Sequence, residues 1–231
     1  MKTLPKLVIF DMDGTMLDTE PVSLAGMIHA GKILGVEIKK EIGESLMGKS
    51  LKLGTEILRA NYGETFDINQ AYKLHREYMD DFFEKNGIST KAGIFELLDT
   101  LEKLQIKKCV ATSTGKARAT HKLTQTNLAH RFQTITGGDE VENGKPSPDI
   151  FLKAAESCGV APQDCIILED TEAGILGAVA ANIPVIAIPD IAPLTQEIRA
   201  KAFAVCTDLH EVATILEDLG GLCPPNPLQT F

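Results

Sequence analysis

Short apolar runs recur along this chain, and longer stretches with helical spacing of apolar residues separate them. The runs are Leu7–Phe10, Cys109–Ala111, Thr134–Thr136, Ile166–Leu168, Val185–Ile188 and Ala204–Cys206. A short apolar run that ends at a turn signal is typical of a buried parallel strand. The helical spacing is clear ahead of the second run, at Ile94, Leu97, Leu98, Leu101 and Leu104. Such alternation predicts an α/β fold with a doubly wound, Rossmann-like parallel sheet.

The alternation is interrupted once, after the first run. Residues 19–86 contain no convincing strand, and their apolar residues recur at helical spacing, as at Ile57 and Leu58. Helices inserted after the first strand predict a separate all-helical domain. We therefore expect residues 1–18 and 87–231 to form the α/β core domain and residues 19–86 to form the inserted helical domain.

Charge and composition exclude several classes of function. A formal net charge of −9 and a pI near 5.1 argue against a partner that is nucleic acid or an anionic membrane. A small anionic substrate remains compatible, because it needs only a local pocket of donors. There is no signal-like segment and no apolar run of the roughly 20 residues that span a bilayer, so we expect a cytoplasmic protein.

The cysteines fit a reducing compartment. There are five of them, none in a C-x-x-C motif, and several lie in or beside apolar runs, as expected for buried, non-catalytic thiols; they are Cys109, Cys158, Cys165, Cys206 and Cys223. The final segment, 220–227, is rich in glycine and proline and is predicted to be a loose tail.

Polar residues follow four of the expected strands. They are Asp11 and Asp13 after the first, Thr112 and Ser113 after the second, Lys145 downstream of the third, and Glu169 and Asp170 after the fourth. In an open parallel sheet the carboxyl ends of the strands share one edge, and ligands bind there. These four clusters should therefore converge on one crevice.

The chemistry of these clusters is complementary. Carboxylates as close as Asp11 and Asp13 repel each other, and a cation that holds the charges together makes the pair tolerable. Together with Glu169 and Asp170 they require a hard divalent cation with oxygen ligands, most simply Mg²⁺. Hydroxyl, amide and ammonium donors from the other two clusters suit anionic oxygens. The set fits phosphoryl transfer through an aspartyl-phosphate.

Each cluster also has a simpler interpretation when it is taken alone. Lys145 lies in a segment that is compatible with an ordinary loop before a helix. Glu169 and Asp170 are compatible with a helix cap, and the segment 112–114 is a plausible N-cap. The four clusters together, in this order at strand ends, favour a site.

The motifs resemble those of the haloacid dehalogenase-like (HAD) superfamily, in its phosphatase branch with a helical cap. They are Asp11-x-Asp13-Gly14-Thr15, Thr112 after an apolar strand, Gly144-Lys145-Pro146 and Glu169-Asp170. The resemblance implies that Asp11 is the nucleophile and Asp13 the general acid and base. It further implies that residues 19–86 are the cap and that the substrate is a small phosphorylated metabolite.

The same resemblance implies the ligands. Mg²⁺ would be held by the carboxylates of Asp11 and Asp170 and by the backbone carbonyl of Asp13. Glu169 would ligate it directly or through water. Thr112 and Lys145 would bind the transferring phosphate.

Within this branch the chain is similar to β-phosphoglucomutase-like enzymes and to pseudouridine-5′-phosphate phosphatases. The mutases carry an arginine where this chain has Leu51, and a cap histidine where it has Ser23. Both differences favour a phosphatase over a phosphomutase, which remains the alternative. A signalling receiver domain is a less favoured alternative, because it would lack the inserted helices. Dehalogenation is disfavoured, because the dehalogenases of this superfamily do not use the metal that the acidic cluster predicts.

The segment Gly43–Ser50 formally matches the phosphate-loop pattern G-x-x-x-x-G-K-[ST]. That motif needs a buried strand before it. The residues before Gly43 are too polar for such a strand, and the match falls within the helical insert. We interpret the segment as a cap loop that faces the crevice, with Lys49 as a substrate contact.

Overall fold

The computed structural model describes residues 3–49 and 51–221, so the tail beyond residue 221 and Cys223 lie outside the described residues. Six parallel strands form one sheet in the order β3-β2-β1-β4-β5-β6. They are β1 (Leu7–Phe10), β2 (Lys107–Thr112), β3 (Ile135–Gly137), β4 (Cys165–Glu169), β5 (Val185–Ala187) and β6 (Ala204–Val205). Every strand overlaps one of the apolar runs in the sequence, so the predicted parallel sheet is confirmed.

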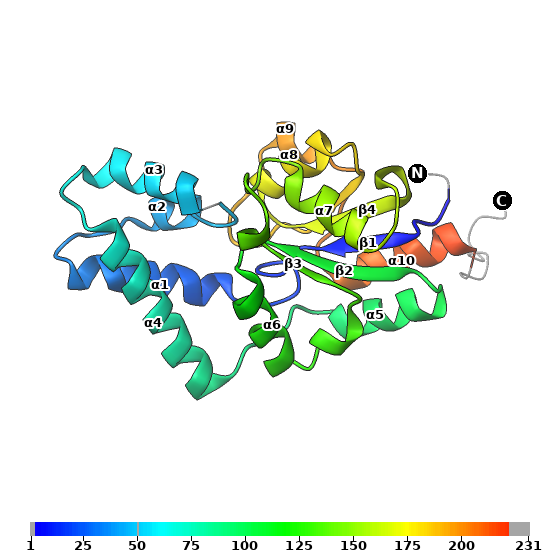
Figure 1. Ribbon diagram of the computed structural model, residues 1–231, viewed down its shortest axis with the longest axis horizontal. Helices are drawn as coiled ribbons and strands as arrows, with labels where there is room; N and C mark the ends of the chain where they lie inside the picture. The colour runs from blue at the N-terminus through cyan, green and yellow to red at the C-terminus, as the bar shows by residue number, and fades with distance from the viewer. Residues whose placement is uncertain (1–2, 50, 222–231) are drawn as a thin grey trace, which may run out of the picture.

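Helices cover both faces of this sheet (Figure 1). One face carries α5 (Ile94–Lys103), α6 (Lys116–Gln125) and α10 (Leu209–Gly220), and the other carries α7 (Asp149–Ser157), α8 (Glu172–Ala180) and α9 (Gln196–Arg199). Short 3₁₀ turns lie between these elements, at Ala129–Arg131, Gly138–Glu140 and Pro162–Asp164.

The sequence of β1 explains the two layers. Successive side chains of a strand point to opposite faces. Val8 and Phe10 accordingly pack with α5 and α10, whereas Leu7 and Ile9 pack with α7 and α8, and all four are fully buried. This burial on both faces is why the strand reads as a continuous apolar run, and it confirms the doubly wound prediction.

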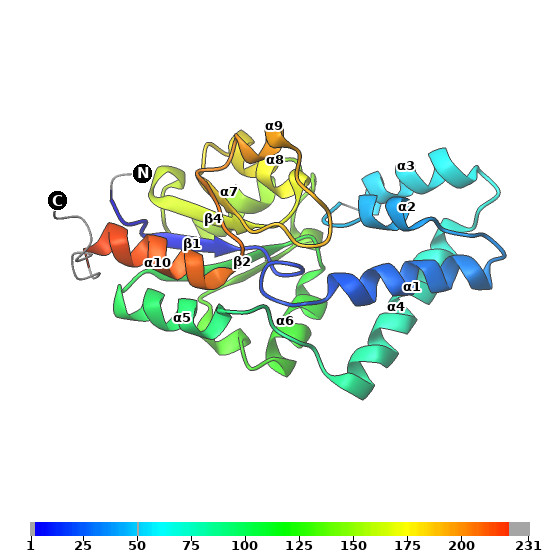
Figure 2. The same cartoon turned by 180° about the vertical axis from the view of Figure 1, so that it is seen from behind.

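Four further helices lie together beyond the carboxyl edge of the sheet (Figures 1 and 2). They are α1 (Glu20–Ile33), α2 (Lys40–Ser45), α3 (Leu51–Tyr62) and α4 (Ile68–Asn86). They enclose a small core of their own that includes Met27, Leu58 and Phe66. The described part of this segment contains no strand, so the predicted inserted helical cap is confirmed.

The two chain segments that join the cap to the sheet run side by side. The amide of Asp18 donates to the carbonyl of Ser89 (2.9 Å), and the amide of Lys91 donates to the carbonyl of Met16 (2.8 Å). The Lys91 ammonium also bonds to Asp190 (2.7 Å). These bonds fix where the cap leaves and rejoins the core.

The four cysteines in the described residues, Cys109, Cys158, Cys165 and Cys206, are buried free thiols, as expected. Among the helices of residues 3–49 and 51–221, none has the length and apolar character needed to cross a membrane.

Candidate active site

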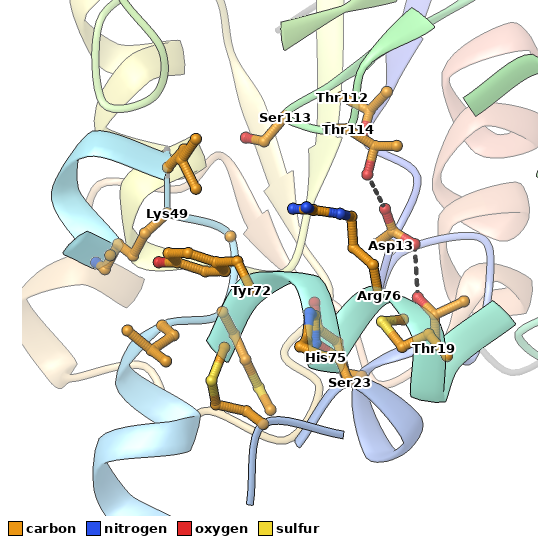
Figure 3. A pocket seen from close by; sticks show the side chains of 18 of the residues that line it. Asp13, Thr19, Ser23, Lys49, Tyr72, His75, Arg76, Thr112, Ser113 and Thr114 are labelled. Atoms are coloured by element: carbon orange, nitrogen blue, oxygen red, sulfur yellow. Dashed lines mark hydrogen bonds between the residues drawn. The ribbon is translucent and has the colours of Figure 1, made fainter. Parts of the chain in front are cut away.

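The polar clusters predicted from the sequence meet at the carboxyl edge of the sheet. A cavity of about 290 Å³ lies there, between the core and the cap. Asp11, Asp13, Thr112 and Ser113 line it from the core, and side chains of α1, α3 and α4 line it from the cap (Figure 3). Lys145, Glu169 and Asp170 are buried beside Asp11.

Lys145 joins two of the buried carboxylates. Its ammonium donates to Asp11 Oδ1 and, at 2.7 Å, to Glu169 Oε2. Burial raises the pKa of Asp11 to about 8, because the Lys145 charge offsets the effect of desolvation only partly and Glu169 adds repulsion. Burial alone would lower the pKa of the Lys145 ammonium, but the charges and hydrogen bonds of Asp11 and Glu169 outweigh burial and raise this pKa. Lys145 therefore stays charged.

Asp11, Glu169 and Asp170 form a candidate metal site. Each offers one carboxylate oxygen, and these atoms lie within 4.8 Å of one another in a buried position. Burial, together with the charges of Glu169 and Asp11, raises the pKa of Asp170 well above its ordinary value. One ammonium thus faces three carboxylates, and the uncompensated charge fits a divalent cation with oxygen ligands.

Gly14 allows the first motif to approach Asp170. Its φ is +85°, and a Cβ at this position would collide with the Asp170 carboxylate. Because the backbone comes this close, the hydroxyl of the next residue, Thr15, donates a hydrogen bond to Asp170 Oδ1 at 2.9 Å. The Asp-x-Asp-Gly-Thr motif therefore positions Asp170, the candidate metal ligand that follows β4, as well as its own carboxylates.

Asp13 has a different environment from that of Asp11. Its Oδ1 accepts from Thr19 (2.7 Å) and from Lys122 (2.6 Å), and its Oδ2 accepts from Thr114 (2.7 Å); Figure 3 draws the two threonine bonds. Burial would raise the pKa of Asp13. The charge and hydrogen bond of Lys122, together with the hydrogen bonds from Thr19 and Thr114, outweigh burial and hold this pKa below its ordinary value. The carboxylate of Asp13 is thus held apart from the metal cluster and favours its deprotonated form.

Thr112 is the last residue of β2, and Ser113 follows it in the turn before α6. Thr112 is buried, and its hydroxyl accepts from the amide of Thr114 at 3.1 Å. The hydroxyl of Ser113 is buried and has no hydrogen-bond partner among the described residues, although the residue lines the cavity. This turn offers hydroxyl groups to a ligand in the cavity.

Glu169 is fixed by the start of the helix that follows it. Its Oε1 accepts from the hydroxyl of Thr171 (2.7 Å) and from the amides of Asp170 (3.2 Å) and Thr171 (2.9 Å). The N-cap of α8 is Thr171, which accepts from the amide of Gly174. The simpler interpretation of Glu169 and Asp170 as helix caps therefore does not hold.

The cap loop closes the cavity from the other side. Gly48 has a φ of +64°, and a Cβ there would collide with the side chain of Thr171. Lys49 lines the cavity, but its ammonium points away from Asp13 in Figure 3. Gly43 lies inside α2, and no strand precedes it in the described part of the cap, so the phosphate-loop arrangement is absent there.

We expect Gly48→Ala to lower kcat/KM at least about tenfold, because displacing the loop from Thr171 opens the site. Gly35→Ala is a matched control, since Gly35 has a similar φ of +74° but nothing within 4 Å of a Cβ. Both variants carry the backbone strain of a left-handed residue, about 1 kcal/mol. Steady-state kinetics compares them, and an equal loss in both would contradict the role of the Gly48–Thr171 contact.

Several residues of the site were not found from the sequence. Lys122 bonds to Asp13 from α6, and no motif marks it. Thr114 belongs to the cluster after the second strand, but its bond to Asp13 was not predicted. Ser23 lacks the imidazole of similar enzymes, yet the structure supplies one from α4, because His75 Nε2 lies 3.1 Å from Ser23 Oγ. Burial and the charge of Arg118 lower the pKa of His75 to about 4, so this imidazole is neutral.

Comparison with known proteins identifies the family. The family model described as haloacid dehalogenase-like hydrolase matches residues 8–188. The chain belongs to this family.

Individual relatives agree with that assignment. A Thermotoga maritima protein named "Phosphorylated carbohydrates phosphatase" is 30% identical over 181 residues, which cover 76% of this chain and 81% of the relative. A Drosophila melanogaster protein named "Probable pseudouridine-5'-phosphatase" is 32% identical over 212 residues, which cover 88% of this chain and 89% of the relative. The predicted family and the prediction of a phosphatase of this family are confirmed.

Solved structures match the fold. The structure of a hydrolase from Pseudomonas syringae aligns with a TM-score of 0.82 at 25% identity, over 92% of this chain and 98% of that one.

Proposed function

We propose that this member of the family is a Mg²⁺-dependent phosphatase that hydrolyses a small phosphorylated metabolite, a sugar phosphate or a nucleoside-type phosphate. The observation that carries the proposal is the environment of Asp11. Its buried carboxyl opens on the cavity, is bonded to Lys145 and lies two residues from a second carboxylate with its own donors. The relatives named for phosphorylated carbohydrates and for pseudouridine phosphate support this substrate range.

In the first half-reaction Asp11 would attack the phosphorus atom. The bond from phosphorus to the leaving oxygen breaks as the bond to Asp11 forms. Asp13, carrying the proton that it takes from water at the end of each turnover, would donate that proton to the leaving oxygen. Lys145 supports this role because its bond to Asp11 fixes the orientation of the carboxylate. Thr112, Ser113 and Lys145 would bind the oxygens of the transferring phosphate.

In the second half-reaction Asp13 would take a proton from water, which then attacks the phosphorus of the phosphorylated Asp11. The low pKa of Asp13 supports this step, because the deprotonated form is the one that accepts a proton. The bonds to Lys122, Thr19 and Thr114 would hold the acceptor in place.

The carboxylates of Asp11 and Asp170 and the backbone carbonyl of Asp13 would hold Mg²⁺, whose positive charge offsets the negative charge of the phosphate oxygens. Glu169 would act through a water molecule. Both of its carboxylate oxygens already accept hydrogen bonds from protein groups, which supports the indirect role.

We further propose the domain division 1–18 and 87–231 for the core and 19–86 for the cap, with the cap selecting the substrate. The paired linkers beside Asp18 and Lys91 support hinges at these two points. Lys49 would contact the substrate from the cap loop if its side chain turned toward the cavity that it lines.

Hydrolysis is proposed in preference to a phosphomutase reaction. Leu51, at the position of the mutase arginine, is 65% exposed and offers no charge to a second phosphate. A buried second phosphate needs a cation beside it, and the cap cations that line the cavity, Lys49 and Arg76, lie at other positions than that of the mutase arginine.

The test is a screen of phosphorylated metabolites with Mg²⁺ that records both phosphate release and product identity. We expect stoichiometric phosphate and the free alcohol. An isomerised phosphate ester that forms faster than phosphate, in the presence of a bisphosphate primer, would contradict hydrolysis.

A further inference from the structure

Glu20, the first residue of α1, carries a buried carboxyl group with an unpartnered oxygen. Its side chain is 5% exposed and lines the same cavity as Asp11 and Asp13. Its Oε2 atom is buried and has no hydrogen-bond partner among the described residues. Buried polar atoms are nearly always partnered, so an exception at a cavity wall indicates a group that a ligand supplies.

The charges around Glu20 restrict what that ligand group is. Burial, Asp13, Asp11 and Asp190 raise the pKa of Glu20 to about 8. Lys122 acts in the opposite direction, but its ammonium is bonded to Asp13. A second anionic group on the substrate would be repelled here.

A hydroxyl group fits this environment in either protonation state of Glu20. It donates to a carboxylate, and it also accepts from a protonated carboxyl. Lys91, a half-buried cation of the linker between cap and core, is already bonded to Asp18 and Asp190. The described residues therefore offer Oε2 of Glu20 no fixed partner that a hydroxyl would have to displace.

Ser23 and His75 extend the same polar surface. Ser23 lies three residues beyond Glu20 on α1, so both side chains are on one face of the helix. The Ser23 hydroxyl is bonded to the neutral imidazole of His75, and both residues line the cavity. The cap thus presents further groups that both donate and accept, opposite the two aspartates.

We propose that Glu20 binds a hydroxyl group on the leaving alcohol of the substrate, so that this enzyme selects phosphate monoesters of polyhydroxylated alcohols. This inference rests on the proposed phosphatase function, since the cavity must hold the ester whose phosphate faces Asp11. Glu20 is then a substrate-binding residue from the cap, with Ser23 and His75 beside it for neighbouring hydroxyls.

The test couples the removal of one substrate hydroxyl to the removal of Glu20. Wild type, Glu20→Ala and Glu20→Gln are assayed on hexose, pentose, hexitol and glycerol phosphates, on their monodeoxy analogues and on p-nitrophenyl phosphate. We expect that one substrate hydroxyl depends on Glu20. Removing this hydroxyl should lower the kcat/KM of wild type at least about tenfold, but it should change the kcat/KM of Glu20→Ala less than about threefold. Glu20→Gln, which still donates and accepts, should retain part of the discrimination.

Glu37→Ala is the control, because Glu37 is an exposed glutamate of the cap that does not line the cavity. It should keep the wild-type ratios, and thermal unfolding checks that every variant is folded. Equal losses for each ester and its deoxy analogue in Glu20→Ala would overturn the inference and leave the phosphatase function intact. A higher wild-type kcat/KM for p-nitrophenyl phosphate than for every polyol phosphate would also overturn the inference without contradicting the phosphatase function. Failure to hydrolyse any ester would contradict the proposed function itself, and the inference with it.

Discussion

The Asp11→Asn protein is expected to release phosphate more than about 10⁴-fold more slowly than wild type, the scale on which loss of a nucleophile acts. An amide is a poor nucleophile, and two carboxylates near it, those of Asp13 and Glu169, are already engaged by hydrogen-bond donors. Asp13 is held by three donors, and Glu169 accepts hydrogen bonds on both oxygens. Phosphate release from the best substrate of the screen measures the effect.

Asp164→Asn provides the control for that substitution. Asp164 is a surface aspartate paired with Lys6, and it precedes the amino end of β4, whereas the site lies at the carboxyl end of that strand. Exposed ion pairs contribute less than about 1 kcal/mol to stability. We expect wild-type turnover in this variant. Residual activity of Asp11→Asn within tenfold of wild type would exclude Asp11 as the nucleophile.

Removal of divalent cations is expected to abolish turnover, and Mg²⁺ should restore it. The reason is the excess of negative charge where Asp11, Glu169 and Asp170 meet, since within residues 3–49 and 51–221 Lys145 is the one ammonium bonded to this cluster. Ca²⁺ should restore activity poorly, because its looser coordination does not hold octahedral geometry. Full activity in excess chelator would contradict the metal requirement.

Binding of the cation also has a readout that is independent of activity. Saturating Mg²⁺ should raise the Tm of wild type, since a ligand at 100 times its Kd stabilises the folded state by about 2.7 kcal/mol. The increase should be much smaller for Asp170→Asn. Burial raises the pKa of Asp11 to about 8, so below that pH the cation must displace a proton and its apparent affinity should fall as the pH falls.

Most of the fold was predictable because its signals are local. Strands buried on both faces are continuous apolar runs, and parallel topology brings their carboxyl ends to one edge. That rule alone placed Asp11 and Thr112 at one cavity, and Asp170 beside Asp11, although the three residues lie far apart in the sequence.

The cap side of the site was less predictable, because its contacts join segments that no short motif links. His75 restores an imidazole beside Ser23 from a helix some fifty residues away, and Lys122 reaches Asp13 from α6. The environment of Glu20 likewise depends on burial, which a single polar residue at the start of an expected helix does not reveal.

The central claim, that Asp11 carries the phosphoryl group during turnover, is tested most directly with the Asp13→Asn protein. Without the Asp13 carboxylate the water attack should slow, whereas p-nitrophenyl phosphate has a leaving group that needs no proton from Asp13. The phosphorylated protein should therefore accumulate after mixing with p-nitrophenyl phosphate and Mg²⁺. Mass spectrometry of rapidly quenched samples should place one phosphoryl group on the peptide that contains Asp11, and none in the Asp11→Asn protein. A phosphoryl group on another residue, or on the peptide of the Asp11→Asn protein, would contradict this account.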